Sequence, residues 1–165
     1  MATNAEPLSA KVQDSFRQLT AAAANLNAVS DELGKPIAEL EEALKKLSLG
    51  VVVWARMESD HEPDGGGWWT RDIGYAKING KWGISLRSRS GDEEYPERDR
   101  EEAWQFNEAP RWMRVKGIEH IPTLLDQMVL ETNGAAEKLR AKISEASEIV
   151  GAVRASVPAP VGKKK

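Results

Sequence analysis

The chain has 165 residues, of which 41% are hydrophobic and 30% charged, and its net charge is −3. This composition indicates an ordered chain of one domain, or a small domain with an appendage, that nothing overall draws to nucleic acid or an anionic membrane. The absence of cysteine excludes disulfides and thiolate chemistry. The start of the chain lacks the pattern of a secretory signal, and the longest apolar run, VVVWA, is too short to span a bilayer. We therefore expect a cytoplasmic protein.

Residues 1–7 are expected to be a flexible tail, and residues 8–48 a long helix. The apolar residues of this segment are spaced alternately by four and three positions, which is typical of a heptad stripe. Gly34 and Pro36 interrupt the stripe without shifting its register, so we predict a kink or break at 34–36. The stripe positions predicted to form a helix–helix interface are Leu19, Leu26, Leu33, Ile37, Leu40 and Leu44.

Residues 49–118 hold all six tryptophans and are predicted to form a β-sheet head. VVVWARMES is typical of a buried strand. Asn79-Gly80, between two alternating runs, predicts a two-residue hairpin that pairs Ile78 with Lys81. AWQFN could add an edge strand after the charged loop 90–102, so we expect three or four antiparallel strands. Pro110 predicts the start of a short helix over about 110–119.

Residues 120–155 are predicted to form a second long helix, followed by a flexible basic tail at 156–165. Its interface positions are Leu125, Met128, Leu139 and Ile143. Large side chains crowd the end of the first helix and the start of the second, whereas alanines collect in their other halves. An antiparallel pair would match large with large and small with small. The predicted fold is therefore α+β: a long antiparallel helical hairpin, a coiled-coil-like stalk, with the small antiparallel sheet inserted between its two helices.

The sequence contains no recognisable catalytic, cofactor or metal-binding motif. Asp60, His61, Glu62 and Asp64 could ligate a divalent metal, but their spacing matches no known ligand pattern and suits a hairpin loop equally well. The expectation is a protein that is not an enzyme and has no cofactor, with a metal-dependent enzyme centred on loop 60–64 as one alternative.

Arginines and tryptophans alternate in the head, which makes it the predicted partner-binding region. The residues assigned to it are Trp68, Trp69, Arg71, Arg87, Arg89, Arg111 and Arg114. Trp68 and Trp69 are neighbours in a strand, so their rings should point to opposite faces. Binding of a partner protein is favoured, together with self-association through the stalk, most simply as a dimer. The other alternative is a nucleic-acid-associated module, which requires Arg87, Arg89, Arg111 and Arg114 to converge on one face.

Overall fold

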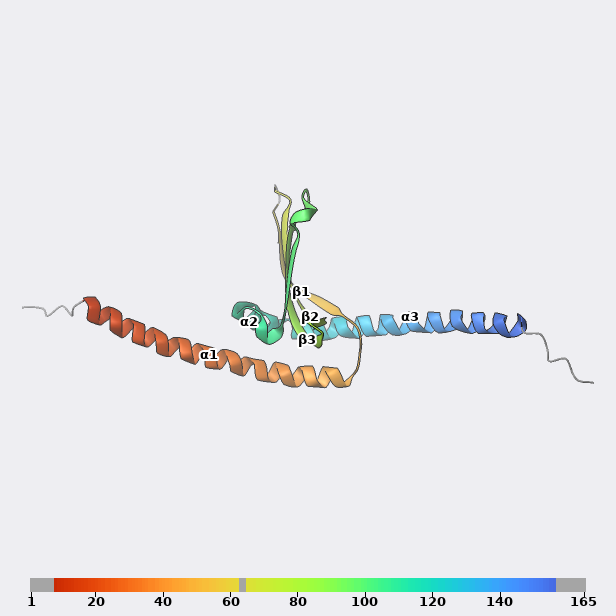
Figure 1. Cartoon of the computed structure of the whole chain (residues 1–165), viewed down its shortest axis with the longest axis horizontal. Helices are drawn as coiled ribbons and strands as arrows, with labels where there is room; N and C mark the ends of the chain where they lie inside the picture. Colours follow the sequence, from red (N-terminus) through yellow and green to blue (C-terminus); the bar gives the residue numbers. More distant parts are fainter. Residues whose placement is uncertain (1–7, 63–64, 157–165) are drawn as a thin grey trace, which may run out of the picture.

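A computed structural model describes residues 8–62 and 65–156. The predicted tails, 1–7 and all but the first residue of 156–165, lie outside the described residues, as does Asp64. The fold is α+β, and an antiparallel sheet lies between two long helices, as predicted (Figure 1). In chain order the elements are α1 (Leu8–Lys46), β1 (Val53–His61), β2 (Gly67–Ile78), β3 (Lys81–Asp92), η1 (Pro96–Arg98), β4 (Arg100–Gln105), η2 (Phe106–Glu108), α2 (Arg111–Glu119) and α3 (Ile121–Ser156).

The four strands lie in sequence order, each antiparallel to the next. The predicted hairpin is confirmed, because Ile78 pairs with Lys81 and both Asn79 and Gly80 have positive φ angles, of 50° and 82°. Those left-handed angles are what a two-residue hairpin turn needs and what asparagine and glycine tolerate best. The fourth strand also exists, although it begins at Arg100, inside the segment that was predicted to be a loop.

The core lies between one face of the sheet and all three α-helices. Ile73 and Leu86 face each other across β2 and β3 and are fully buried, together with Met113 of α2 and Leu124 of α3. Ile37 and Leu44 bring the second half of α1 into the same cluster. Only part of the sheet is covered in this way: its other half, with the end of β1, the start of β2 and η1, projects away from the helices (Figure 1).

Helix α1 continues through residues 34–36 and contains Pro36 in its interior. Figure 1 shows a gently curved helix without a break. Gly34 does not end a helix. It lies against the side chain of Asn107 in η2, where an added Cβ would come within 2.5 Å of the Asn107 Oδ1. The glycine therefore serves close packing of the helix against the head.

The two long helices are not folded into a hairpin. From the sheet, α1 extends to one end of the molecule and α3 to the other, so Leu8 and Ser156 lie far apart (Figure 1). α1 packs mainly on β3 and η2, whereas α3 packs on β1, β2 and α2. The physical reason for this difference from the predicted stalk is that the apolar stripe of each helix is covered by the head in the half nearest to it. The stripe specified which face of the helix is apolar, and the sheet, not the other helix, covers it.

Candidate functional site

The first half of α1 extends beyond the head. We call residues 8–29 the N-arm; none of its side chains is buried. Its stripe is open to solvent, and the Phe16 residue is 69% exposed. The large exposed apolar residues of the arm are Leu8, Val12, Phe16, Leu19, Leu26 and Val29. A contiguous apolar surface of this kind is rare on a monomer and typical of an interaction site.

The last part of α3 is a second free helix. We call residues 137–156 the C-arm; every residue in it is exposed. Its large exposed apolar residues are Leu139, Ile143, Ile149, Val150 and Val153. The N-arm and C-arm point away from each other along the long axis of the molecule (Figure 1).

The residues predicted to form the stalk interface therefore divide into two groups. Those near the head pack on its core: Leu33, Ile37, Leu40, Leu44, Leu125 and Met128. The others lie on the arms and face solvent: Leu19, Leu26, Leu139 and Ile143. The structure does not bring the second group together within one chain.

An apolar hollow lies at the base of each arm. At the base of the N-arm, Leu26, Leu33 and Val115 of α2 line a hollow of about 470 Å³. Where the end of α1 approaches the start of α3, Leu47 and Val129 line a second hollow of about 290 Å³. Both hollows extend the exposed apolar surface of the arms toward the head.

On the helix-covered side of the sheet, Arg71 lies between two tryptophans. Its guanidinium carbon is 4.3 Å from the centroid of the Trp69 ring and 4.4 Å from that of Trp112 in α2. Arg71 also donates to the Glu58 Oε1 at 2.7 Å, and Lys116 donates to the other oxygen of the same carboxylate. These hydrogen bonds, of which the one from Lys116 has the larger effect, hold the pKa of Glu58 below its ordinary value. The Trp112 residue remains 49% exposed, so the cluster has a solvent-facing edge.

On the other face of the sheet, side chains of the strands themselves lie over the small residues. The Trp54 ring lies over Gly74, where an added Cβ would overlap it, and the Arg87 guanidinium lies 4.0 Å from the centroid of that ring. Trp54 is half-buried on this face and lies outside the hydrophobic core. A face of small side chains allows such a large ring to lie close to the backbone, and at Gly74 the Trp54 ring does so.

Asp72 is 2% exposed and is held on this face by three arginines. The Arg56 Nε is 2.6 Å from its Oδ1, and Nη2 atoms of Arg87 and Arg89 are 3.0 and 3.3 Å from its Oδ2. The three guanidiniums compensate the buried charge of one carboxylate. They act here as structural partners of Asp72.

The arginines of α2 face α1 instead. Arg111 donates to the Asn27 Oδ1 at 2.7 Å, and Arg114 donates to the Ser30 hydroxyl at 2.6 Å. Because α2 packs on the helix-covered side, these two arginines and the pair Arg87 and Arg89 lie on opposite sides of the sheet. The convergence required by the nucleic-acid alternative is not formed by these four side chains.

Trp68 and Trp69 point to opposite sides of the sheet, and both are half-buried. Trp69 stacks on Arg71, whereas the Trp68 ring lies against Gly91. Atoms of both residues, together with Asp60, His61 and Glu62, line a hollow of about 250 Å³ at this end of the sheet. Among residues 8–62 and 65–156, no three acidic or histidine side chains are grouped so that they could hold a metal ion.

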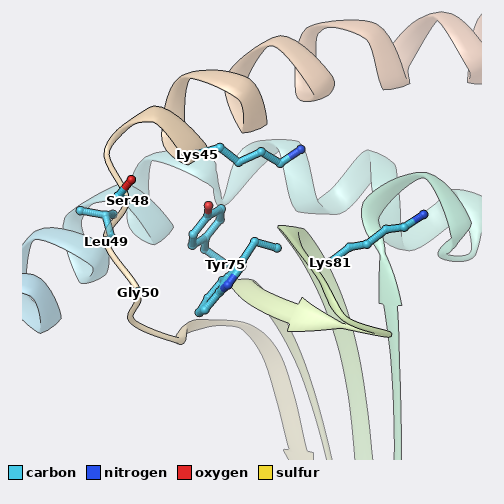
Figure 2. Close-up of a pocket in the computed structure, with 7 residues that line it drawn as sticks. Lys45, Ser48, Leu49, Gly50, Tyr75 and Lys81 are labelled. Atoms are coloured by element: carbon cyan, nitrogen blue, oxygen red, sulfur yellow. The ribbon is translucent and has the colours of Figure 1, made fainter.

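A hollow of about 610 Å³ lies where the end of α1 and the loop after it meet the β2–β3 hairpin (Figure 2). Its wall includes the stacked rings of Tyr75 and Trp82, whose centroids are 5.4 Å apart. Burial raises the pKa of Tyr75. Lys45 donates to the Glu42 carboxylate at 2.8 Å. The rings and the Lys45 ammonium thus already have partners within the fold.

Glu41 links α1 to β3. Its Oε1 accepts a hydrogen bond of 2.8 Å from the backbone N–H of Ile84. Burial nevertheless raises the pKa of Glu41 above its ordinary value. The Ile84 hydrogen bond lowers it only in part, so the negative charge is disfavoured in the folded protein.

In the part of the chain that the structure describes, no helix is long and apolar enough to cross a membrane. Comparison of the chain with protein-family models, curated proteins and solved structures finds no match.

Proposed function

We propose that the protein is a non-enzymatic assembly protein that self-associates through its two helical arms and presents its head to a partner protein. The observation that carries this proposal is the exposed apolar stripe on both arms, which runs over residues 8–29 and 137–156. Isolated helices of this length are marginally stable in water, and tertiary or quaternary packing of their apolar face normally stabilises them. Self-association would provide that packing.

The test compares two identical substitutions on the N-arm. Ala23 lies on the apolar stripe and Ala21 on the opposite side of the helix, and both are exposed in a single chain. A monomer would tolerate Ala23→Glu and Ala21→Glu equally. In a self-associated protein, Ala23→Glu places a charge in the interface and should weaken association at least about tenfold, whereas Ala21→Glu should not.

Analytical ultracentrifugation over a range of concentrations gives the readout. The proposal expects an oligomer of the wild-type chain at tens of micromolar that Ala23→Glu dissociates. A wild-type monomer at that concentration, or equal behaviour of the two variants, would contradict it.

For the head, the proposed contact is the solvent-facing edge of the Trp69, Arg71 and Trp112 cluster. Tryptophan and arginine are the residues most often found at the energetic centre of protein interfaces. Binding to a partner captured with the wild-type protein should be lost with Trp112→Ala. It should be retained with Val115→Ala, a change at another exposed residue of α2. Equal binding by both variants would exclude this contact.

A further inference from the structure

The direction, length and apolar pattern of the exposed arms indicate which surface packs against them. The N-arm ends at the head and the C-arm begins there, and the two point in opposite directions (Figure 1). If two copies are related by a twofold axis perpendicular to the long axis of the molecule, the C-arm of one copy lies on the same side as the N-arm of the other. The two arms then run antiparallel, side by side.

The lengths of the two arms agree. At about 1.5 Å per residue, residues 8–29 span about 33 Å and residues 137–156 about 30 Å. Two such pairings, one at each end of the molecule, would bury stripes about 10 Å wide on four helix surfaces. The total, on the order of 1,200 Å², reaches the range of specific interfaces.

The apolar pattern of the two arms also matches in antiparallel register. Along the N-arm, Phe16, Leu19, Ala23 and Leu26 are separated by three, four and three positions, and Val153, Val150, Ala146 and Ile143 repeat those steps along the C-arm in reverse. Aligned in this way, the alanines Ala23 and Ala146 share one layer, and larger side chains meet on both sides of it. The narrow layer allows close approach, and the flanking layers fill the space beside it.

Symmetry favours this pairing over like-with-like contacts. If each N-arm paired with another N-arm and each C-arm with another C-arm, every chain would have two separate twofold contacts, and the assembly would grow without closing. Reciprocal pairing of N-arm with C-arm about a single axis uses both arms of both chains and closes at two copies. From these observations we infer that two copies form a closed dimer in which the N-arm of each chain packs antiparallel on the C-arm of the other. This inference rests on the proposed self-association and specifies its geometry.

The test uses fluorescence energy transfer between full-length chains, which is simplified because the protein has no cysteine of its own. Ala21→Cys on the N-arm and Glu148→Cys on the C-arm are exposed, lie off the stripe, and accept a dye without entering the proposed interface. Donor-labelled and acceptor-labelled chains are mixed, unfolded and refolded together. Three mixtures are compared: 21 with 148, 21 with 21, and 148 with 148.

The reciprocal dimer predicts energy transfer in the 21-with-148 mixture alone, because paired helix axes lie about 10 Å apart and like sites lie at opposite ends. Energy transfer in the 21-with-21 or 148-with-148 mixture would overturn the reciprocal pairing. So would the absence of transfer in the 21-with-148 mixture when sedimentation shows an oligomer. In either case the proposed self-association itself would remain. A monomer by sedimentation overturns both.

A charge pair tests the register. In the reciprocal dimer, Ala23→Glu combined with Ala146→Lys places opposite charges in one layer, twice per dimer. This double variant should associate about tenfold more tightly than Ala23→Glu alone. Ala23→Glu combined with Ala141→Lys, which lies off the stripe, should show no such recovery. Equal recovery by the two double variants would overturn the register.

Discussion

The buried carboxylate of Asp72 offers a sharp test of how the face of the sheet that carries Trp54 is held together. Asp72→Asn keeps the size of the side chain but removes its charge and replaces one acceptor oxygen with an NH₂ group. That group would face the guanidiniums of Arg87 and Arg89, whose Nη2 atoms now lie 3.0 and 3.3 Å from Oδ2. Donors would then face donors, and three positive charges would lose their common partner.

The expected cost follows from the burial of the four groups. Removing one partner of a buried ion pair costs about 3–5 kcal/mol. The carboxylate is only 3% exposed, but the Arg56 and Arg89 side chains are 47% and 32% exposed and can be hydrated again. Arg87 is only 14% exposed and cannot do so to the same extent. We therefore expect a loss near the lower limit, about 3 kcal/mol, and a decrease in Tm of about 6–12 °C.

The assay is urea unfolding followed by far-UV circular dichroism, with Asp31→Asn as the matched control. Asp31 is an exposed residue of α1, so its substitution should change the free energy of unfolding by less than about 0.5 kcal/mol. A double-mutant cycle with Arg87→Gln should show coupling, because the two side chains are in direct contact. Equal effects of Asp72→Asn and Asp31→Asn would refute the view that the arginine cluster stabilises this face of the sheet.

Three further predictions concern single residues. Gly74→Ala should destabilise the fold by about 1–3 kcal/mol in urea unfolding and alter the near-UV circular dichroism, because its Cβ overlaps the Trp54 ring; an unchanged spectrum would contradict this packing. Gly134→Ala meets no atom within 4 Å and should raise stability by about 1 kcal/mol through helix propensity, so a loss would show that α3 needs the glycine. Glu41→Gln should be more stable than the wild type at pH 7 in denaturant titrations. Because the folded pKa of Glu41 is raised, this advantage should shrink as the pH falls toward 4.5, and a constant difference would refute the assigned cause.

The sheet shows which features of the head could be predicted from local sequence. Asn79-Gly80 fixes the β2–β3 turn, and the two-residue loop then sets every pair along both strands. That register alone places Arg87 opposite Asp72, so this contact could have been found from the sequence. The contribution of Arg56 could not, because a bulge between Arg56 and Glu58 shifts the β1–β2 register.

In the candidate partner-binding cluster too, some contacts follow from the local sequence and others depend on tertiary packing. Trp69 and Arg71 lie two positions apart in one strand, so their shared face follows from the alternation of side chains. Trp112 comes from α2, and its position over the guanidinium depends on how that helix packs on the sheet. Gly117 of α2 lies close to Leu86, where an added Cβ would be 3.2 Å from the Leu86 Cδ2, so this packing involves segments far apart in the sequence.

The long helices show what a heptad pattern can and cannot specify. The alanine-rich outer halves of the two helices match in antiparallel register, and for these halves the contacts would be the same whether both helices belong to one chain or to two. The head decides between these cases, because Ile37 and Leu44 fix α1 against it, and Leu124 fixes α3. Those contacts direct the free halves away from each other (Figure 1). In the proposed dimer the complementarity of the arms is used between chains, and a wild-type monomer with matched but unpaired arms would contradict that explanation.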